Sequence, residues 1–206
     1  LHAVGHWFES DIAHLLFYTM QTIPDYYIIP TAIDRDTAQL IQRQMHGKQL
    51  ETSKFHTGIE DKKIRNSQHH WISTDSWIAG MLKHFIEVAN NNLFHYDLTK
   101  WSEQIQYTVY DGPSSHYTWH RDIKESSIFG PNTVAKLSIT LFLNDPSEYE
   151  GGEFQLMFGG DTHMHTMKPP IGTAIIFPAT SRHRLRPLRS GKRTSLVAWM
   201  GGPPFR

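Results

Sequence analysis

The hydrophobic pattern of this chain changes its period near residue 103, and that change limits the folds it can adopt. Upstream, apolar residues recur at the spacing of a helix face. Downstream, apolar and polar residues alternate, most strictly over Lys136–Asn144, as expected for strands with one buried face. Helices followed by about eight short strands predict an α+β fold, in which supporting N-terminal helices pack on one face of a closed or sandwiched antiparallel barrel.

The predicted elements are bounded by capping and turn residues. Helices are expected over 3–21, from an Asp34 N-cap to about Met45, and from Thr74 or Asp75 to Asn90. Strands are expected at 26–29, 103–110, 136–144, 153–158, 163–168, 173–177, 183–187 and 193–200, with a turn at Arg189–Gly191. Without a repeat or linker, the chain is expected to form one domain over 1–206, with helical support over about 1–100 and the strand core over about 101–206.

Residues 47–70 are polar and only weakly periodic. They predict a solvated connector, with one short strand at Phe55–Ile59 and an exposed loop over Glu60–Asn66. The alternative is a mobile cover over a site, because long irregular segments often carry function.

The composition narrows the chemistry open to the chain. Twenty Lys and Arg balance 20 Asp and Glu, so no net basic field favours nucleic acid as a partner. The absence of cysteine excludes disulfides, zinc–thiolate sites and iron–sulfur clusters, so imidazoles and carboxylates must hold any transition metal. No apolar run reaches the ~20 residues that cross a bilayer. The chain starts at Leu1 without a signal pattern, so a cytoplasmic protein is expected, and a leader removed before Leu1 stays open.

His120 and Asp122 form an H-x-D pair. Side chains at i and i+2 of an extended segment point to the same face, so one imidazole and one carboxylate can converge on one point. His183, which follows the apolar strand and turn at 172–182, offers a third ligand. Two histidines and one carboxylate leave half of an octahedron open, the arrangement expected of a non-haem Fe(II) oxygenase. A lone H-x-D also arises by chance in a chain with 14 histidines, and a surface or core histidine is then the alternative.

Other histidines compete for the metal. His163 and His165 share a face, but they lie in a Met-rich polar hairpin that predicts a solvated strand, and His116 is a further rival. A zinc hydrolase is disfavoured, because no glutamate matches the general base of an H-E-x-x-H helix.

Arg193 is embedded in an otherwise apolar strand, ten residues after His183. It shares a face with Ser195, Val197 and Trp199, so a guanidinium and a hydroxyl lie side by side. An unpaired charge in such a strand is costly, and a bound carboxylate would offset that cost. The alternative is a surface arginine in the basic segment 182–193.

The stretch from about Tyr107 to Trp199 resembles the Fe(II)/2-oxoglutarate-dependent dioxygenases, specifically their prolyl 4-hydroxylase-like branch and its bacterial PKHD-type relatives. The matching pieces, in order, are Tyr110, Tyr117, His120-x-Asp122, Leu137–Asn144, Tyr149–Phe154, Gly172 to His183, and Gly191 to Trp199. The resemblance implies a double-stranded β-helix core. It covers residues 30–106 more loosely and gives no counterpart for 1–23.

The resemblance also implies roles for individual residues. His120, Asp122 and His183 would bind Fe(II), and Arg193 would hold the distal carboxylate of 2-oxoglutarate. Tyr110 would contact the cosubstrate from the barrel wall, and Trp199 would pack beside the same pocket. Phe142 departs from relatives that place a tyrosine there to assist the arginine, so Ser195 or Thr140 is expected to supply that hydroxyl. Residues expected at the substrate are Tyr117, Trp119, Arg121 and Arg184, with solvent as the alternative for the two arginines.

The implied activity is hydroxylation of an unactivated C–H bond with Fe(II), 2-oxoglutarate and O2, giving succinate and CO2, with ascorbate as a further small molecule. An intact Asp122 favours hydroxylation over halogenation. The expected substrate is proline in a peptide or protein, as for enzymes of the procollagen-proline 4-dioxygenase type. Two alternatives stay open: the same chemistry on a free amino acid or a non-prolyl residue, and a metal-binding jelly roll that senses or binds without turnover. The sequence leaves a monomer or a homodimer open.

Overall fold

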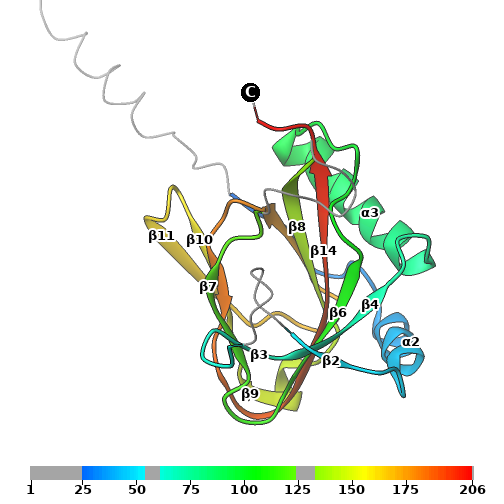
Figure 1. Ribbon diagram of the computed structural model, residues 1–206, viewed down its shortest axis with the longest axis vertical. Helices are drawn as coiled ribbons and strands as arrows, with labels where there is room; N and C mark the ends of the chain where they lie inside the picture. The colour runs from blue at the N-terminus through cyan, green and yellow to red at the C-terminus, as the bar shows by residue number, and fades with distance from the viewer. Residues whose placement is uncertain (1–24, 54–60, 124–132, 206) are drawn as a thin grey trace, which may run out of the picture.

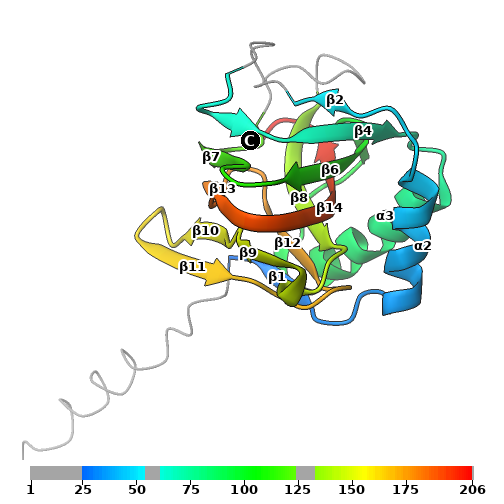
Figure 2. The same cartoon turned by 90° about the horizontal axis from the view of Figure 1, so that it is seen from below.

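The computed structural model describes residues 25–53, 61–123 and 133–205, which fold into two antiparallel sheets facing each other (Figures 1 and 2). The larger sheet has the strand order β1 (Tyr27–Ile29), β12 (Ala174–Pro178), β8 (Val134–Phe142), β14 (Leu188–Gly202), β6 (Ile105–Asp111), β4 (Gln68–Ile72), β2 (Glu51–Thr52). Two further strands pair with β14, namely β5 (Lys100–Trp101) and β9 (Tyr149–Gly151). The smaller sheet has the order β11 (His163–Met167), β10 (Phe154–Phe158), β13 (His183–Leu185), β7 (His116–His120), β3 (Arg65–Asn66).

Four strands of each sheet form the jelly roll. In the larger sheet the four core strands run β12, β8, β14, β6, and in the smaller sheet they run β11, β10, β13, β7. After β6 the chain crosses repeatedly between the two sheets, although β8 and β9 both belong to the larger sheet and β10 and β11 pair with each other in the smaller one. The predicted antiparallel double-stranded β-helix is confirmed, and the remaining strands extend the sheet edges.

Two helices cover the outer face of the larger sheet (Figures 1 and 2). Helix α2 spans Arg35–Met45, and the Asp34 carboxylate caps it by accepting from the Thr37 N–H at 2.8 Å, as predicted. Helix α3 spans Trp77–Ala89 and begins later than predicted, because the hydroxyl that accepts from the Ala79 N–H belongs to Ser76. A π-helical segment at Asn90–Phe94 follows α3 directly, and a short 3-10 helix spans Pro146–Glu148 between β8 and β9. The predicted helix at 3–21 lies outside the described residues.

Strand alternation separates the packing core from the interior of the barrel. On β6, Ile105, Tyr107 and Val109 point to the helices and join the large apolar cluster with Leu82 and Ile86. The opposite face of β6 carries Gln106, Thr108 and Tyr110, which line a cavity between the sheets. The helices therefore stabilise one face of the sheet and leave the other free for polar groups.

The polar segment 47–70 is not a simple connector. Its described residues contribute β2, β3 and the first residues of β4, which extend both sheets. Polar side chains there bond to one another inside the protein, so low hydrophobicity does not mark exposure. The short strand predicted at Phe55–Ile59 lies outside the described residues.

The predicted turn at Arg189–Gly191 is wrong, because these residues lie inside the 15-residue strand β14. Gly191, with φ of 80°, lets β14 pass close to β9. A Cβ atom there would lie 2.3 Å from the Glu148 carbonyl oxygen. The turn signal therefore marks a bend and a close backbone approach within one strand.

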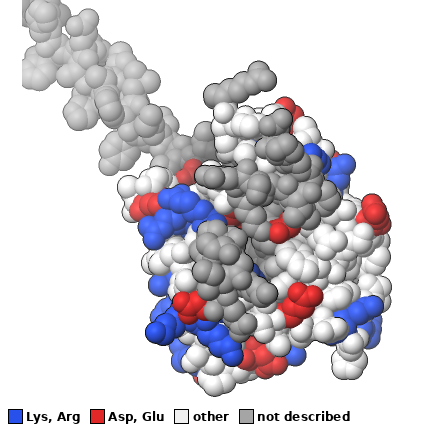
Figure 3. Space-filling view, in the orientation of Figure 1, with Lys and Arg blue, Asp and Glu red and all other residues white. Residues whose placement is uncertain are grey.

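The surface carries charges of both signs. On the face shown in Figure 3, basic and acidic side chains are interspersed, in keeping with the balanced composition. Among the described helices, none has the length and apolar character needed to span a membrane.

Candidate functional site

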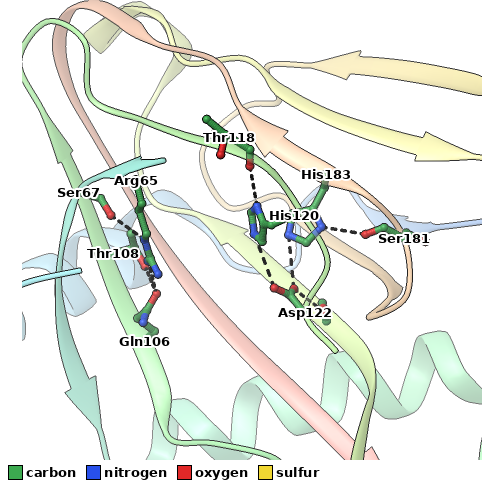
Figure 4. A network of polar contacts seen from close by, with 10 residues as sticks. Arg65, Ser67, Gln106, Thr108, Thr118, His120, Asp122, Ser181 and His183 are labelled. Atoms are coloured by element: carbon green, nitrogen blue, oxygen red, sulfur yellow. Dashed lines mark hydrogen bonds and ion pairs between the residues drawn. The ribbon is translucent and has the colours of Figure 1, made fainter. Parts of the chain in front are cut away.

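Three side chains converge inside the barrel, as Figure 4 shows: His120 at the end of β7, Asp122 two residues later, and His183 at the start of β13. Strands β7 and β13 pair with His120 directly opposite His183, which brings the two imidazoles together. The Nε2 atom of His120 lies 3.6 Å from Asp122 Oδ1, and that of His183 lies 3.4 Å from Oδ2. One donor atom from each residue lies within 4.8 Å of the others. The arrangement fits one metal ion.

Hydrogen bonds orient all three groups. His120 Nδ1 donates to the Thr118 carbonyl at 2.8 Å, and His183 Nδ1 donates to the Ser181 carbonyl at 3.0 Å. Because a carbonyl only accepts, both rings must carry their proton on Nδ1, which leaves the Nε2 lone pairs facing the carboxylate. The Ser138 hydroxyl donates to Asp122 Oδ2 at 2.7 Å. Such outer hydrogen bonds fix the tautomer and direction of metal ligands.

The electrostatics of the triad favour the protonation states that a metal requires. Burial, with help from His183, lowers the pKa of His120 to about 3, although Asp122 opposes the shift. Burial raises the pKa of Asp122, but the two imidazoles and hydrogen bonds from Ser138 and Trp199 outweigh burial and hold it below its usual value. A neutral His120 and an ionised Asp122 are thus ready to coordinate a cation.

A cavity of about 370 Å³ lies around the triad. Its inner end contains Arg193, whose side chain is buried with only 3% of the residue exposed. The guanidinium carbon lies 4.8 Å from the ring centre of Phe142 and 5.6 Å from that of Tyr110. Burial lowers the pKa of Arg193.

The hydrogen-bonding capacity of Arg193 is largely unused. One terminal nitrogen reaches the Ser195 hydroxyl at a long 3.4 Å, and the buried Nε has no hydrogen-bond partner. No described carboxylate forms an ion pair with it. A buried cation with a bare donor fits an anionic ligand, and a carboxylate matches a guanidinium best. The donor set and the cationic inner end therefore fit Fe(II) and 2-oxoglutarate.

The outer wall of the cavity contains a second buried arginine, which the sequence interpretation missed. Arg65 on β3 donates through Nε to the Ser67 hydroxyl at 3.0 Å and through a terminal nitrogen to Gln106 Oε1 at 2.7 Å (Figure 4). Its guanidinium lies 4.6 Å from the ring centre of Tyr117, which in turn stacks on His120 with ring centres 3.5 Å apart. The signal was the alternation of Arg65, Ser67, His69 and Trp71, which predicts a strand with one polar and aromatic face.

The structure brings most of the predicted site residues to the cavity. Besides the triad and Arg193, the predicted residues that line it are Tyr110, Tyr117, Arg121, Thr140, Ser195 and Trp199. Arg121 also donates to the Thr180 carbonyl and forms an ion pair with Asp161 at 2.6 Å, which ties it to the rim.

Trp119 and Arg184 do not line the cavity and need correction. His120 and His183 point inward, so their strand neighbours Trp119 and Arg184 point to the opposite face of the smaller sheet. There the Arg184 guanidinium lies 4.7 Å from the Trp119 ring centre and its Nε donates to Gln155 at 2.6 Å. Both residues pack on the outside of the sheet.

Residues 105–201 match the model of the 2OG-Fe(II) oxygenase superfamily. Over this segment the chain is similar to that superfamily. Enzymes of the superfamily use Fe(II), 2-oxoglutarate and O2, and the facing His-Asp-His group supplies the corresponding ligand set here. The assignment agrees with the resemblance noted from the motifs between Tyr107 and Trp199.

A curated relative is similar to this chain over a comparable length. A PKHD-type hydroxylase from Janthinobacterium sp. (strain Marseille) is 42% identical over 94 residues, which are 44% of this chain and 40% of that protein. The alignment thus spans less than half the length of the curated relative.

Solved structures share the fold over a longer range. A Pseudomonas putida prolyl-4-hydroxylase superposes with a TM-score of 0.63 at 19% identity, over 85% of this chain and 91% of the other. A Trichoplax adhaerens prolyl hydroxylase, solved with a peptide fragment of a hypoxia inducible factor, superposes with a TM-score of 0.70 at 15% identity, over 92% and 89%.

Proposed function

We propose that this protein is an Fe(II)- and 2-oxoglutarate-dependent dioxygenase that hydroxylates C4 of a prolyl residue in a peptide or protein. The observation that carries the proposal is the cavity itself, in which three metal ligands within 4.8 Å of one another stand beside a buried arginine without a carboxylate partner among the described residues. One end of the cavity therefore suits a cation and the adjoining end suits a carboxylate. An iron centre that chelates a 2-oxo diacid needs both.

The residues of the triad would hold the metal. His120 and His183 would each present a neutral Nε2 atom, and Asp122 would add one negative charge. The carbonyls of Thr118 and Ser181 and the hydroxyl of Ser138 keep these groups in place without rearrangement. Bound there, iron with 2-oxoglutarate and dioxygen supplies the oxidising chemistry, which yields succinate, CO2 and a hydroxylated product.

The inner wall would bind and shield the cosubstrate. Arg193 would hold its distal carboxylate, with Tyr110, Thr140 and Ser195 along the same wall. Three nearly fully buried apolar side chains also line the cavity. They are Phe154 and Leu185 from the smaller sheet and Phe177 from the larger sheet. These apolar surfaces exclude water, which strengthens the charge pairing at Arg193 and limits side reactions.

The outer wall suits a peptide. It presents hydrogen-bonding side chains from β2, β4 and β6, together with Tyr117 and Trp199 near the triad. Polar groups at this wall can meet backbone amides, and aromatic faces can contact a pyrrolidine ring. The prolyl specificity is proposed by analogy with the two prolyl hydroxylases named above, whose fold this chain shares.

The test is a turnover assay with matched substrates. The protein is incubated with Fe(II), 2-oxoglutarate and ascorbate, plus either a proline-rich peptide or free proline, and succinate is measured. We expect the peptide alone to stimulate succinate release and to gain about 16 Da, one oxygen atom, by mass spectrometry. The control variant His183→Ala should give neither product.

Each other outcome contradicts a defined part of the proposal. If free proline stimulated succinate release, the substrate would be an amino acid and not a peptide. Oxidation at a carbon other than C4, seen by comparison with authentic 4-hydroxyproline after hydrolysis, would contradict the position. No consumption of 2-oxoglutarate with any member of a peptide library would favour a binding module that keeps the metal without turnover.

A further inference from the structure

Two buried polar groups meet behind the inner end of the cavity, and neither makes a hydrogen bond of good geometry. They are the Nε atom of Arg193 and the hydroxyl of Tyr149. Tyr149 is only 4% exposed, and it belongs to a second apolar cluster together with Tyr110, Phe142 and Phe154. A buried polar atom without a partner costs free energy, so such an atom in a folded protein needs an explanation.

Strand pairing places Tyr149 beside Arg193. In the ladder between β9 and β14, Tyr149 lies opposite Gly191. Arg193 follows Gly191 by two residues on the same strand, so Tyr149 and Arg193 are diagonal neighbours across the ladder. Gly191 carries no side chain, and a Cβ atom there would lie 3.0 Å from the Tyr149 Cβ. The glycine therefore opens the space in which the phenol approaches the guanidinium.

The phenol and the guanidinium act on each other electrostatically. Burial raises the pKa of Tyr149, and the charge of Arg193 opposes that shift. Burial lowers the pKa of Arg193, and Tyr149 and Tyr110 oppose that shift in turn. Among the groups that raise the pKa of Arg193, the Tyr149 phenol therefore has the largest effect.

The Tyr149 side chain is fixed from its other sides. The Lys168 ammonium lies 4.4 Å from the ring centre and donates to the Tyr149 carbonyl at 2.7 Å. A Cβ atom at Gly152 would lie 3.3 Å from the ring, so the chain packs closely against it. A phenol held this firmly can restrict the directions in which Arg193 points.

We propose that Tyr149 is the positioning residue of the cosubstrate site, and that it aims the Arg193 guanidinium at the distal carboxylate of 2-oxoglutarate. The inference rests on the proposed function. Tyr149 is not among the residues that line the cavity, so it acts through Arg193. It takes the part that the sequence interpretation gave to Ser195 or Thr140, in a chain where position 142 is phenylalanine.

The test compares two ligands that differ only at the distal end. Dissociation constants of 2-oxoglutarate and of pyruvate, which keeps the 2-oxo acid but lacks the distal carboxylate, are measured by calorimetry on the protein loaded with redox-inert Mn(II). Tyr149→Phe removes one hydroxyl and keeps the ring. We expect it to weaken 2-oxoglutarate roughly tenfold, the scale of one hydrogen bond to a charged group, while pyruvate and Mn(II) binding stay unchanged.

The matched control is Tyr107→Phe. Tyr107 is also buried, and its hydroxyl bonds to Thr194, which follows Arg193 and lies on the opposite face of β14. That variant should bind both ligands like the unaltered protein. A purely structural role for Tyr149 predicts equal losses for 2-oxoglutarate and pyruvate, or no loss, and either result overturns the inference. Failure of the unaltered protein to bind 2-oxoglutarate would overturn the proposed function as well.

Discussion

The two buried arginines of the cavity are held in different ways. Arg65, which is 9% exposed, donates to Ser67 and Gln106 at 3.0 and 2.7 Å. Arg193, which is 3% exposed, has one long contact of 3.4 Å and a bare Nε. Neither forms an ion pair with a described carboxylate. The protein satisfies the first cation with neutral oxygens and leaves the second under-satisfied.

This difference separates a structural cation from one that awaits a ligand. Burying a charge is costly unless hydrogen bonds compensate it, and Arg65 has that compensation within the fold. Its acceptor Gln106 also receives a hydrogen bond from Thr108 at 3.0 Å, so the outer wall forms a connected network. Arg193 gains its compensation from the carboxylate that the proposed function brings. Substitutions at the two arginines should therefore have opposite signatures.

The largest effect is expected at the proposed metal ligands, which line the same cavity as the two arginines. His120→Ala and Asp122→Ala should each weaken Mn(II) or Fe(II) binding by about 100-fold or more, because each removes one of three ligands and leaves the others without their partner. Calorimetric titration with Mn(II) measures this. His163→Ala, an exposed histidine of β11, is the control and should bind metal normally. Unchanged metal binding in both ligand variants would show that the metal does not bind at His120 and Asp122.

Arg193→Met is expected to have the next largest effect. It should raise the dissociation constant of 2-oxoglutarate roughly 100-fold, because a buried charge pair is lost, while Mn(II) affinity stays the same. The free energy of unfolding without ligand should not fall, since the variant removes an uncompensated buried charge. Calorimetry and urea denaturation measure the two quantities. Unchanged 2-oxoglutarate affinity would show that Arg193 does not hold the cosubstrate.

Arg65→Met should give the reverse signature. The variant removes the donor to the Ser67 hydroxyl oxygen and one of the two donors to Gln106 Oε1, so the free energy of unfolding should fall by about 2 kcal/mol. The affinity for 2-oxoglutarate should remain unchanged, because Arg65 lies in the outer wall of the cavity. The same two measurements apply. If Arg65→Met weakened 2-oxoglutarate as much as Arg193→Met, the distinction between the two arginines would be lost.

The sequence pointed to Arg193 but not to Arg65, and the reason is physical. A lone charge in an apolar strand is conspicuous, because only a partner can offset its burial. Arg65 lies in a polar segment, where its neighbours appear solvated until strand pairing brings Ser67 and Gln106 around it. The alternation of apolar residues predicted the barrel strands, and the i, i+2 spacing of His120 and Asp122 predicted that their side chains converge, since both patterns depend on local geometry.

Long-range register accounts for the remaining differences. Tyr149 lies in a turn motif, and only the pairing of β9 with Gly191 places it behind Arg193. That pairing also explains why Arg189–Gly191 is a bend within β14 and not a turn. The prediction that Trp119 and Arg184 contact the substrate conflicts with strand geometry. Each adjoins an inward-facing ligand on a strand and therefore points outward.

The smallest expected effect tests the electrostatic reach of Arg65. His69 lines the outer wall, where the Ser53 hydroxyl contacts its Nδ1 at 3.0 Å. Burial, followed by the charge of Arg65, lowers the pKa of His69 to about 4. Because the unfolded side chain titrates near 6.5, the unfolded state takes up the proton first as the pH falls. The stability contribution of neutral His69 is therefore complete above about pH 6.5 and is lost as the pH falls toward 4.

Two variants separate the sources of this shift. Between pH 7 and pH 5, urea denaturation should show that His69→Gln loses less stability than the unaltered protein, by about 2 kcal/mol. In Arg65→Met, NMR titration should show the pKa of His69 moving up toward its usual value, because one cause of the depression is gone. Arg193→Met is the control and should leave the His69 pKa where it is, since the two arginines act at different ends of the cavity. The opposite result would be a His69 pKa that stays the same in Arg65→Met and changes in Arg193→Met. It would mean that the charge of Arg193, and not that of Arg65, determines the electrostatic field at His69.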